Sequence, residues 1–290
     1  MAHPSVVAGK SALLLRSADR SAATVSALAD RGAGTVLCPL IDFELPADTT
    51  ALDAGLLRLL GGSYRWLVLT SITTVRALKQ RAEALGLELV LPAGTKLAVV
   101  GDATARAAVA EGMSIDFMPH SDHSAAGMLA DWQDLASPAT AFMPQADLAS
   151  GTLEAGLGSR GWEADVVVAY RTVDAPARPE LRLTAVLNMP GNTAAAPPSA
   201  PVVDAAALIA AAGAPAGVDA VLFTSPSIVR RFLELVPVPA PGLLAIAIGR
   251  STAGELRERG WPAAATAAYP TPEGLADAWE AAHATARNTG

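Results

Sequence analysis

The chain of 290 residues has few of the groups on which several common kinds of protein depend. Its one cysteine, Cys38, excludes an internal disulfide and a cysteine metal cage, and its place after an apolar run predicts a buried thiol. No apolar run reaches the ~20 residues that cross a bilayer, and the segment SALLLRS (11–17) is too short for a secretory signal. We therefore expect a cytoplasmic protein that has no membrane partner.

Basic residues are outnumbered, with 21 Lys and Arg against 28 Asp and Glu, so no basic footprint for nucleic acid is present. The segment GKS at 9–11 lacks the earlier glycine of a phosphate loop, because Pro4 stands there. No G-x-G-x-x-G follows a predicted strand, so a dinucleotide-binding fold is unsupported. No G-x-S-x-G occurs, which disfavours a Ser-His-Asp hydrolase. His120 and His123 have no third ligand near them in sequence, which favours a polar loop over a metal site. We therefore expect no metal site from these motifs.

The composition is that of a buried α/β protein, with 51% hydrophobic and 17% charged residues. A chain of this length is sufficient for two domains that each have a core. The opening segments alternate strand, helix and strand, which predicts a parallel sheet. Residues 174–201 are rich in Pro, Ala and Ser, and we interpret 184–201 as a mobile connection that is poorly suited to a core.

Two landmarks recur in the same order along the chain. LVLTSITTVRAL at 67–78 is matched by VLFTSPSIVRRFL at 221–233, and LAVVGDATARAAVAEGM at 97–113 by LAIAIGRSTAGELRERGW at 244–261. The offset is 154 residues between the serines and 148 between the glycines, counted from Ser71 to Ser225 and from Gly101 to Gly249. Two domains of similar build are the simplest explanation.

Each landmark consists of a strand, a TS or G-x-x-T turn and a helix, so the hydroxyl residue stands where an N-cap belongs. Ligands of open α/β sheets bind beyond the carboxyl ends of the strands, and helix N-termini attract anions. A cleft between two such domains suits a ligand with many negative groups. The candidate binding residues are Thr70, Ser71, Gly101, Thr104, Thr224, Ser225, Ser227, Gly249, Arg250 and Thr252. Simple helix capping is the alternative for the hydroxyl residues, and an ordinary surface arginine for Arg250.

Taken together, these segments resemble uroporphyrinogen-III synthase. The two landmark pairs are joined in this resemblance by the strand ending in VVAYRTV and by YPTPEGLADA, so it extends from about residue 65 to 278. Each motif is weak alone, whereas their ordered combination is specific.

The resemblance implies two flavodoxin-like parallel-sheet domains joined by a two-stranded antiparallel linker, with the ligand cleft between them. The first domain would be discontinuous, comprising residues 1–38 and 174–290, and the second would comprise 42–168. The linker strands would be 36–44 and 166–173. Without the resemblance, a simple division at mid-chain would be the natural interpretation.

The implied activity is that of a lyase of haem biosynthesis. It would cyclise hydroxymethylbilane, a linear tetrapyrrole with eight carboxylates, to uroporphyrinogen III, inverting ring D through a spiro intermediate without any cofactor. We expect a monomer, with possible handover of substrate from hydroxymethylbilane synthase. The alternative is a non-catalytic regulator that binds a tetrapyrrole or another polyanion in the same cleft. A nucleotide-sugar transferase is disfavoured because acidic metal-binding and phosphate-loop signals are absent.

The resemblance also assigns roles to individual residues. Tyr170 matches the tyrosine proposed to help the substrate hydroxyl to leave, with packing on the linker as its alternative role. Ser225 and Thr252 match hydroxyl residues that would bind side-arm carboxylates. The run QADLAS at 145–150 lacks the glycine and basic residues frequent in the family, so Gln145 or backbone amides would replace them.

Overall fold

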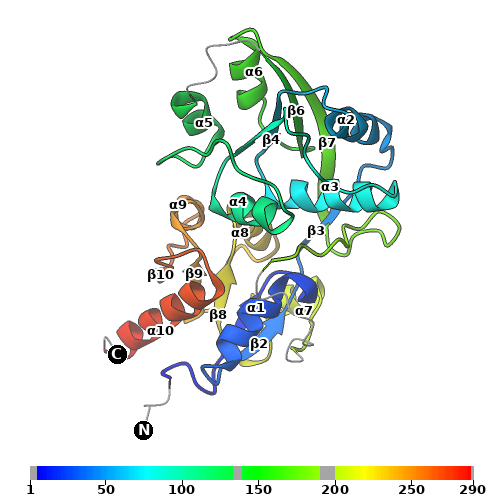
Figure 1. Cartoon of the computed structure of the whole chain (residues 1–290). Coiled ribbons are helices and arrows are strands. Elements are labelled where there is room, and N and C mark those ends of the chain that lie inside the picture. Colours follow the sequence, from blue (N-terminus) through cyan, green and yellow to red (C-terminus); the bar gives the residue numbers. More distant parts are fainter. Residues whose placement is uncertain (1–4, 133–138, 190–199, 289–290) are drawn as a thin grey trace. The chain divides into compact units, whose positions relative to one another are not determined.

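The computed structural model describes residues 5–132, 139–189 and 200–288, and the chain divides into two compact units (Figure 1). The first unit contains residues 1–42, 174–176 and 193–290, and the second contains 43–173 and 177–192. Among the described residues, no helix is long and apolar enough to cross a membrane.

The first unit is a parallel sheet with helices on both faces. Its strands pair in the order β10-β9-β8-β1-β2, and every pairing is parallel. The elements are β1 (Ser11–Leu14), α1 (Ala18–Ala29), β2 (Gly34–Leu37), α7 (Ala205–Ala210), η2 (Pro215–Gly217), β8 (Val218–Phe223), α8 (Pro226–Leu235), β9 (Leu244–Ala247), α9 (Arg250–Glu258), β10 (Ala265–Thr266) and α10 (Pro272–Asn288).

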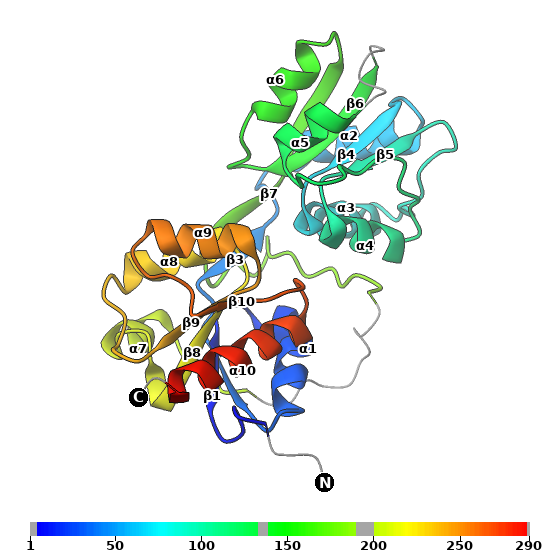
Figure 2. The same ribbon diagram turned by 90° about the vertical axis from the view of Figure 1, so that its left-hand side faces the viewer.

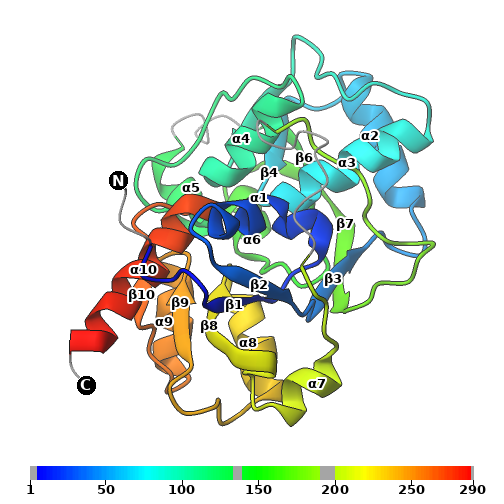
Figure 3. The same ribbon diagram turned by 90° about the horizontal axis from the view of Figure 1, so that it is seen from below.

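Alternate side chains of these strands enter two cores. On one face, Leu14 and Leu222 pack with Trp279 of α10 and residues of α1, and on the other Leu13 packs with Phe232 of α8 and residues of α7 and α9. Figure 3 shows α1 and α10 on one side of this sheet and α7, α8 and α9 on the other. Cys38 is buried as predicted, and burial, followed by the nearby Asp204 carboxylate, raises the pKa of its thiol to about 11.

The second unit repeats this design. Its strands are in the order β3-β7-β6-β4-β5, and the β4–β5, β4–β6 and β6–β7 pairs are parallel. The elements are β3 (Ile41–Glu44), α2 (Thr50–Leu60), β4 (Trp66–Leu69), α3 (Ile72–Ala84), β5 (Lys96–Val99), α4 (Asp102–Ala110), α5 (Ala125–Asp131), β6 (Thr140–Ala146), α6 (Thr152–Gly158) and β7 (Glu163–Asp174).

The second sheet also separates two cores. One core contains residues of α2, α3 and α4, and the other contains Trp66 with Trp132, Trp162 and residues of α5 and α6. The helices of this unit are labelled in Figure 2. The rings of Trp66 and Trp132 meet edge to face, with centroids 4.7 Å apart. Large aromatic side chains therefore fill the α5–α6 side of this sheet.

Both strand orders match the prediction of doubly wound sheets. Counted along each unit, the first sheet has the order 2-1-3-4-5, which is that of the flavodoxin-like fold. The second has the order 2-1-3-4, and β3 occupies its remaining edge beside β7. Of the expected linker strands, β3 is thus an edge strand of the second sheet and β7 is its neighbour, and the unit boundaries fall at Asp42/Phe43 and Val173/Asp174 within them.

The segment 177–189 differs from its sequence-based interpretation. The sequence places it in the first domain, with a mobile connection from 184, whereas these residues contact the second unit. Leu183, Ala185 and Leu187 are buried at alternate positions, and the two leucines belong to the α2–α3 core. Gln80 of α3 accepts hydrogen bonds from the backbone N–H groups of Thr184 and Ala185, at 2.7 and 3.1 Å. The alternation of apolar residues in LRLTAVL (181–187) is the sequence signal of this packing. The rest of the expected mobile connection, 190–199, lies outside the described residues.

An ion pair holds the start of this segment. The Glu44 side chain is almost fully buried and accepts hydrogen bonds from the backbone N–H of Arg178 at 2.7 Å and from its guanidinium at 2.7–3.2 Å. The Arg178 side-chain and backbone hydrogen bonds lower the pKa of Glu44, against the opposing effect of burial. Two chain segments more than a hundred residues apart are thus joined in one unit.

Close packing in the second unit predicts an unequal response to two glycine substitutions. Gly55 of α2 is buried, and a Cβ there would collide with the Phe142 ring, whereas a Cβ on Gly158 would meet no atom within 4 Å. We expect Gly55→Ala to lower the free energy of unfolding by about 1–3 kcal/mol and Gly158→Ala not to lower it. Urea denaturation measures both, and a Gly55→Ala variant as stable as wild type would contradict this packing.

Candidate active site

The first turn of α3 begins at the carboxyl end of β4. Ser71 is its N-cap, with extended backbone angles (φ −151°, ψ 140°), and its Oγ accepts a hydrogen bond from the backbone N–H of Thr73 at 3.0 Å. Thr70 and Ser71 are both partly exposed. The predicted capping role of Ser71 is therefore confirmed, and its position at the sheet edge leaves it accessible.

The neighbouring strand β5 leads into the Gly101 turn at the same edge. Gly101 is the N-cap of α4 in an extended conformation, and a Cβ there would lie 3.4 Å from Cβ of His123. Thr104 is buried, so the exposed group at the start of this helix is Asp102. A carboxylate there opposes the binding of an anion to the helix N-terminus.

The first unit has the matching turns. Ser225 is the N-cap of α8, and its Oγ accepts a hydrogen bond from the Ile228 N–H at 3.4 Å and lies 3.0 Å from Ser227 Oγ. Pro226 stands at the first helical position, where no N–H is needed. Thr224, Ser225 and Ser227 are partly exposed at the carboxyl end of β8.

The Gly249 turn is the counterpart of the Gly101 turn, with one difference of charge. Gly249 is extended (φ −176°, ψ 176°), and a Cβ there would meet no atom within 4 Å. Arg250 is exposed at the position that Asp102 occupies in α4, whereas Thr252 is only 1% exposed. Of the two turns, the one in the first unit therefore has the charge that favours an anion.

Tyr170 joins this set from the far end of β7. Its hydroxyl donates a hydrogen bond to Ser71 Oγ at 3.1 Å, and its ring meets Phe43 of β3 edge to face, with centroids 5.5 Å apart. The residue is 7% exposed. A phenol and a serine that are 99 positions apart thus meet at the N-terminus of α3.

The surroundings of Tyr170 keep its phenol protonated. Burial raises the pKa of Tyr170 above the ordinary ~10, the Asp147 carboxylate adds to this, and hydrogen bonds with Ser71 and Thr73 act in the opposite direction. At neutral pH the group is therefore a proton donor and not a base.

The orientation of Tyr170 depends on a bulge in β7. Gln145 pairs with Val168 and Ala146 pairs with Tyr170, so Ala169 is the extra residue. Beyond the bulge, the Asp147 N–H donates to the Tyr170 carbonyl at 3.0 Å. Sequence reasoning missed Asp147, because the register of two strands leaves no local signal in either.

The predicted residues thus form two groups, one in each unit. Thr70, Ser71, Gly101, Thr104, Gln145 and Tyr170 belong to the carboxyl edge of the second sheet, and Thr224, Ser225, Ser227, Gly249, Arg250 and Thr252 to that of the first. Ser71 and Tyr170 are in direct contact. Binding roles for the others, and a cleft shared by the two groups, stay predictions.

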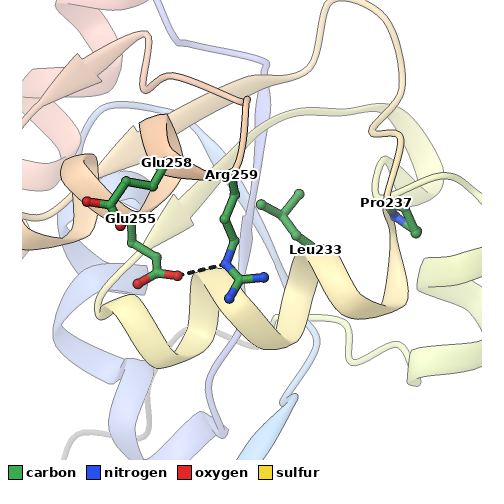
Figure 4. A pocket seen from close by; sticks show the side chains of 5 residues that line it. All are labelled: Leu233, Pro237, Glu255, Glu258 and Arg259. Atoms are coloured by element: carbon green, nitrogen blue, oxygen red, sulfur yellow. Dashed lines mark hydrogen bonds and ion pairs between the residues drawn. The ribbon is translucent and has the colours of Figure 1, made fainter.

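A hollow in the first unit takes no part in this arrangement. A hollow of about 490 Å³ between α8 and α9 is lined by Leu233, Pro237, Glu255, Glu258 and Arg259 (Figure 4), none of which is a predicted site residue. Its Glu255 accepts a hydrogen bond from Arg259 at 2.7 Å. Within residues 5–132, 139–189 and 200–288, no three His, Cys, Asp or Glu residues are grouped as metal ligands.

A family model described as "Uroporphyrinogen-III synthase HemD" matches residues 22–277. The chain belongs to the uroporphyrinogen-III synthase family. Both units and every predicted site residue lie within the matched span, apart from the terminal segments of the first unit. A comparison with curated proteins gave no match.

Solved structures of uroporphyrinogen-III synthases resemble this chain. A mutant enzyme from the extreme thermophile Thermus thermophilus matches with a TM-score of 0.63 and 19% identity, covering 96% of this chain and 100% of that one. The wild-type enzyme in another crystal form gives 0.50 and 19%, covering 97% and 100%. The Helicobacter pylori enzyme gives 0.49 and 16%, covering 92% and 97%. At such identities, the first two matches show a common fold.

The contact between Ser71 and Tyr170 predicts an energetic coupling. Ser71→Ala removes a helix cap, at about 0.5–2 kcal/mol, and also the partner of a buried hydroxyl, at about 1–3 kcal/mol. We expect Ser71→Ala to destabilise more than Ser225→Ala, a cap without a tyrosine partner. Hydrogen exchange measured by mass spectrometry reports the stability of each unit separately, so the two losses of stability can be compared.

A double-mutant cycle provides the control for this coupling. In a Tyr170→Phe background, Ser71→Ala should cost only the loss of the cap, because no hydroxyl is left without its partner. An equal cost of Ser71→Ala in both backgrounds would show that the contact contributes nothing.

The raised pKa of Tyr170 predicts a dependence of stability on alkaline pH. The unfolded chain loses this proton near pH ~10, whereas the folded chain retains it to higher pH. Folding stability is therefore fully present below that pH and falls as the pH rises through it. We expect the urea midpoint to fall less between pH 9 and 11 in Tyr170→Phe than in wild type. Identical slopes would contradict the burial of a protonated phenol.

Proposed function

We propose that this chain catalyses the cyclisation of hydroxymethylbilane to uroporphyrinogen III, inverting ring D, and is therefore a lyase of haem biosynthesis. The family to which the chain belongs supports the overall activity. The observation that carries the assignment of residues is the buried, protonated phenol of Tyr170, held by Ser71 at the N-terminus of α3.

In the proposed first step, Tyr170 protonates the terminal hydroxyl of the substrate, which leaves as water. The phenolate that remains can only accept, so the Ser71 hydroxyl, whose oxygen accepts the Thr73 N–H at the α3 N-terminus, donates to it and stabilises its charge. The loss of water leaves an azafulvene, an electrophilic carbon at the end of the chain of pyrroles. General acid catalysis of this kind typically contributes 10²–10⁴-fold to a rate.

The following steps require control of conformation more than a reactive side chain. Ring D attacks the azafulvene through its substituted α-carbon to give a spiro-pyrrolenine. Cleavage of one bond of the spiro carbon and closure at the other position of ring D give the inverted ring, and loss of a proton, which restores the Tyr170 phenol, completes the cycle. Uncatalysed closure gives the isomer without inversion, so the protein must hold the substrate in the conformation that favours the spiro centre.

The eight substrate carboxylates suit the turns before α3, α8 and α9, whereas Asp102 opposes an anion before α4. Each helix N-terminus that binds an anion contributes about 0.3–1 kcal/mol when exposed, so affinity would result from their number. Arg250, exposed at the start of α9, would add a charge-assisted pair. A cleft between the units, a monomeric state, a cytoplasmic location and handover from hydroxymethylbilane synthase remain predictions.

An isomer assay tests the proposed function. Supplied with hydroxymethylbilane, the protein should yield mainly the type III isomer after oxidation and chromatography, and Tyr170→Phe should lower kcat by about 10²-fold or more. The matched control is Tyr64→Phe. That tyrosine is also buried and bonded to Asp165 and to Arg58 (2.7 Å), but it lies before β4, away from the carboxyl edge. Formation of type I alone by the wild type would overturn the proposal.

A further inference from the structure

The second unit contains a carboxylate, Asp147, that contacts the strand presenting Tyr170. Asp147 follows β6, and its backbone N–H donates to the Tyr170 carbonyl at 3.0 Å. Its Oδ1 accepts from the Thr172 N–H at 3.3 Å, and its Oδ2 lies 3.5 Å from Arg171 Nε. One residue thus contacts three consecutive residues of β7.

These contacts lie directly after the bulge, where the direction of the tyrosine is decided. Val167 and Ala169 belong to the α2–α3 core. In a regular strand, alternation would direct Tyr170 to the opposite face from these two residues. The extra residue places Ala169 and Tyr170 side by side in the same core, and Arg171 becomes exposed. The bulge therefore determines whether the phenol reaches Ser71.

A bulge leaves the ladder locally unpaired, so the strand beyond it needs another partner to keep its register. Pairing of β6 with β7 ends at Ala146 and Tyr170. Asp147 supplies the next hydrogen bonds to β7. Its backbone N–H donates to the Tyr170 carbonyl, and its carboxylate accepts from the Thr172 N–H.

We propose that Asp147 is the positioning residue for Tyr170, fixing the strand after the bulge so that the phenol stays at the α3 N-terminus. It acts through the tyrosine and does not itself contact the reacting atoms. The inference rests on the proposed function for its catalytic consequence only, because the placement of the phenol is measurable without turnover.

Substitution of Asp147 tests the proposal through kinetics. Asp147→Ala should lower kcat by about 10-fold to 10²-fold, as misplacement of a catalytic group by about 1 Å does, with KM little changed. Asp147→Asn retains an oxygen that accepts from Thr172, so it should recover most of the rate. In Tyr170→Phe, adding Asp147→Ala should cost nothing further, because the group it positions is gone.

Asp116→Ala is the matched control for loss of a carboxylate that binds strand backbone. Asp116 Oδ2 accepts the Leu97 N–H of β5 at 2.8 Å, away from Tyr170, so its removal should leave kcat of the folded protein unchanged. Wild-type kcat in Asp147→Ala, or rate losses that multiply in the double variant, would overturn the proposal.

A spectroscopic measurement separates this inference from the proposed function. Tyrosinate absorbance, taken as the difference between each protein and its Tyr170→Phe counterpart, reports the ionisation of Tyr170 alone. Asp147→Ala should ionise at lower pH than Asp147→Asn, because both lack the charge but only the former releases the phenol from its buried place. Coincident curves would refute positioning even in a protein that makes no type III isomer, whereas separated curves in such a protein would uphold it.

Discussion

The hydrogen bond between Tyr170 and Ser71 connects the two kinds of structure on which the proposed chemistry depends. Ser71 caps α3 and so lies where the helix directs its free N–H groups, and Tyr170 comes from the strand that closes the second unit. Because the phenol is buried, its neutral form is favoured, and because its oxygen faces a helix N-terminus, the negative charge left by proton donation is also stabilised. A general acid needs both a neutral form before proton transfer and a stabilised anion after it.

The repeated architecture supplies similar turns with different charges. Both units place a TS turn and a G-x-x-T turn after adjacent strands, and the glycine N-caps have almost the same backbone angles. Yet Asp102 and Arg250 occupy equivalent positions, and Tyr170 belongs to the second unit. Under the proposed function, the second unit would supply the acid and the first the stronger attraction for anionic side arms, a difference that sequence similarity between the repeats conceals.

The segment 177–189 illustrates how a composition rich in Pro and Ala misleads. Its apolar residues alternate over a short run, and the groups that hold it are far away in sequence: Glu44 on β3 and Gln80 on α3. A short edge segment has too little periodicity to be distinguished from a loop, and its stability comes from partners that only the folded chain brings together. The sequence-based assignment of this segment to the first domain differs from the structure for the same reason.

The sequence by itself determined the local features: strands that end in hydroxyl or glycine turns, serine caps at 71 and 225, a buried Cys38, two α/β domains and the family. Each depends on residues close together in the chain or on a pattern repeated along it. The tertiary structure alone decided that Ser71 meets Tyr170, that a bulge at Ala169 directs the phenol inward, and that Asp147 holds the strand beyond it. The register between two strands is set by packing across the whole sheet, because a shift of one residue exchanges the faces, and no short stretch of sequence encodes it.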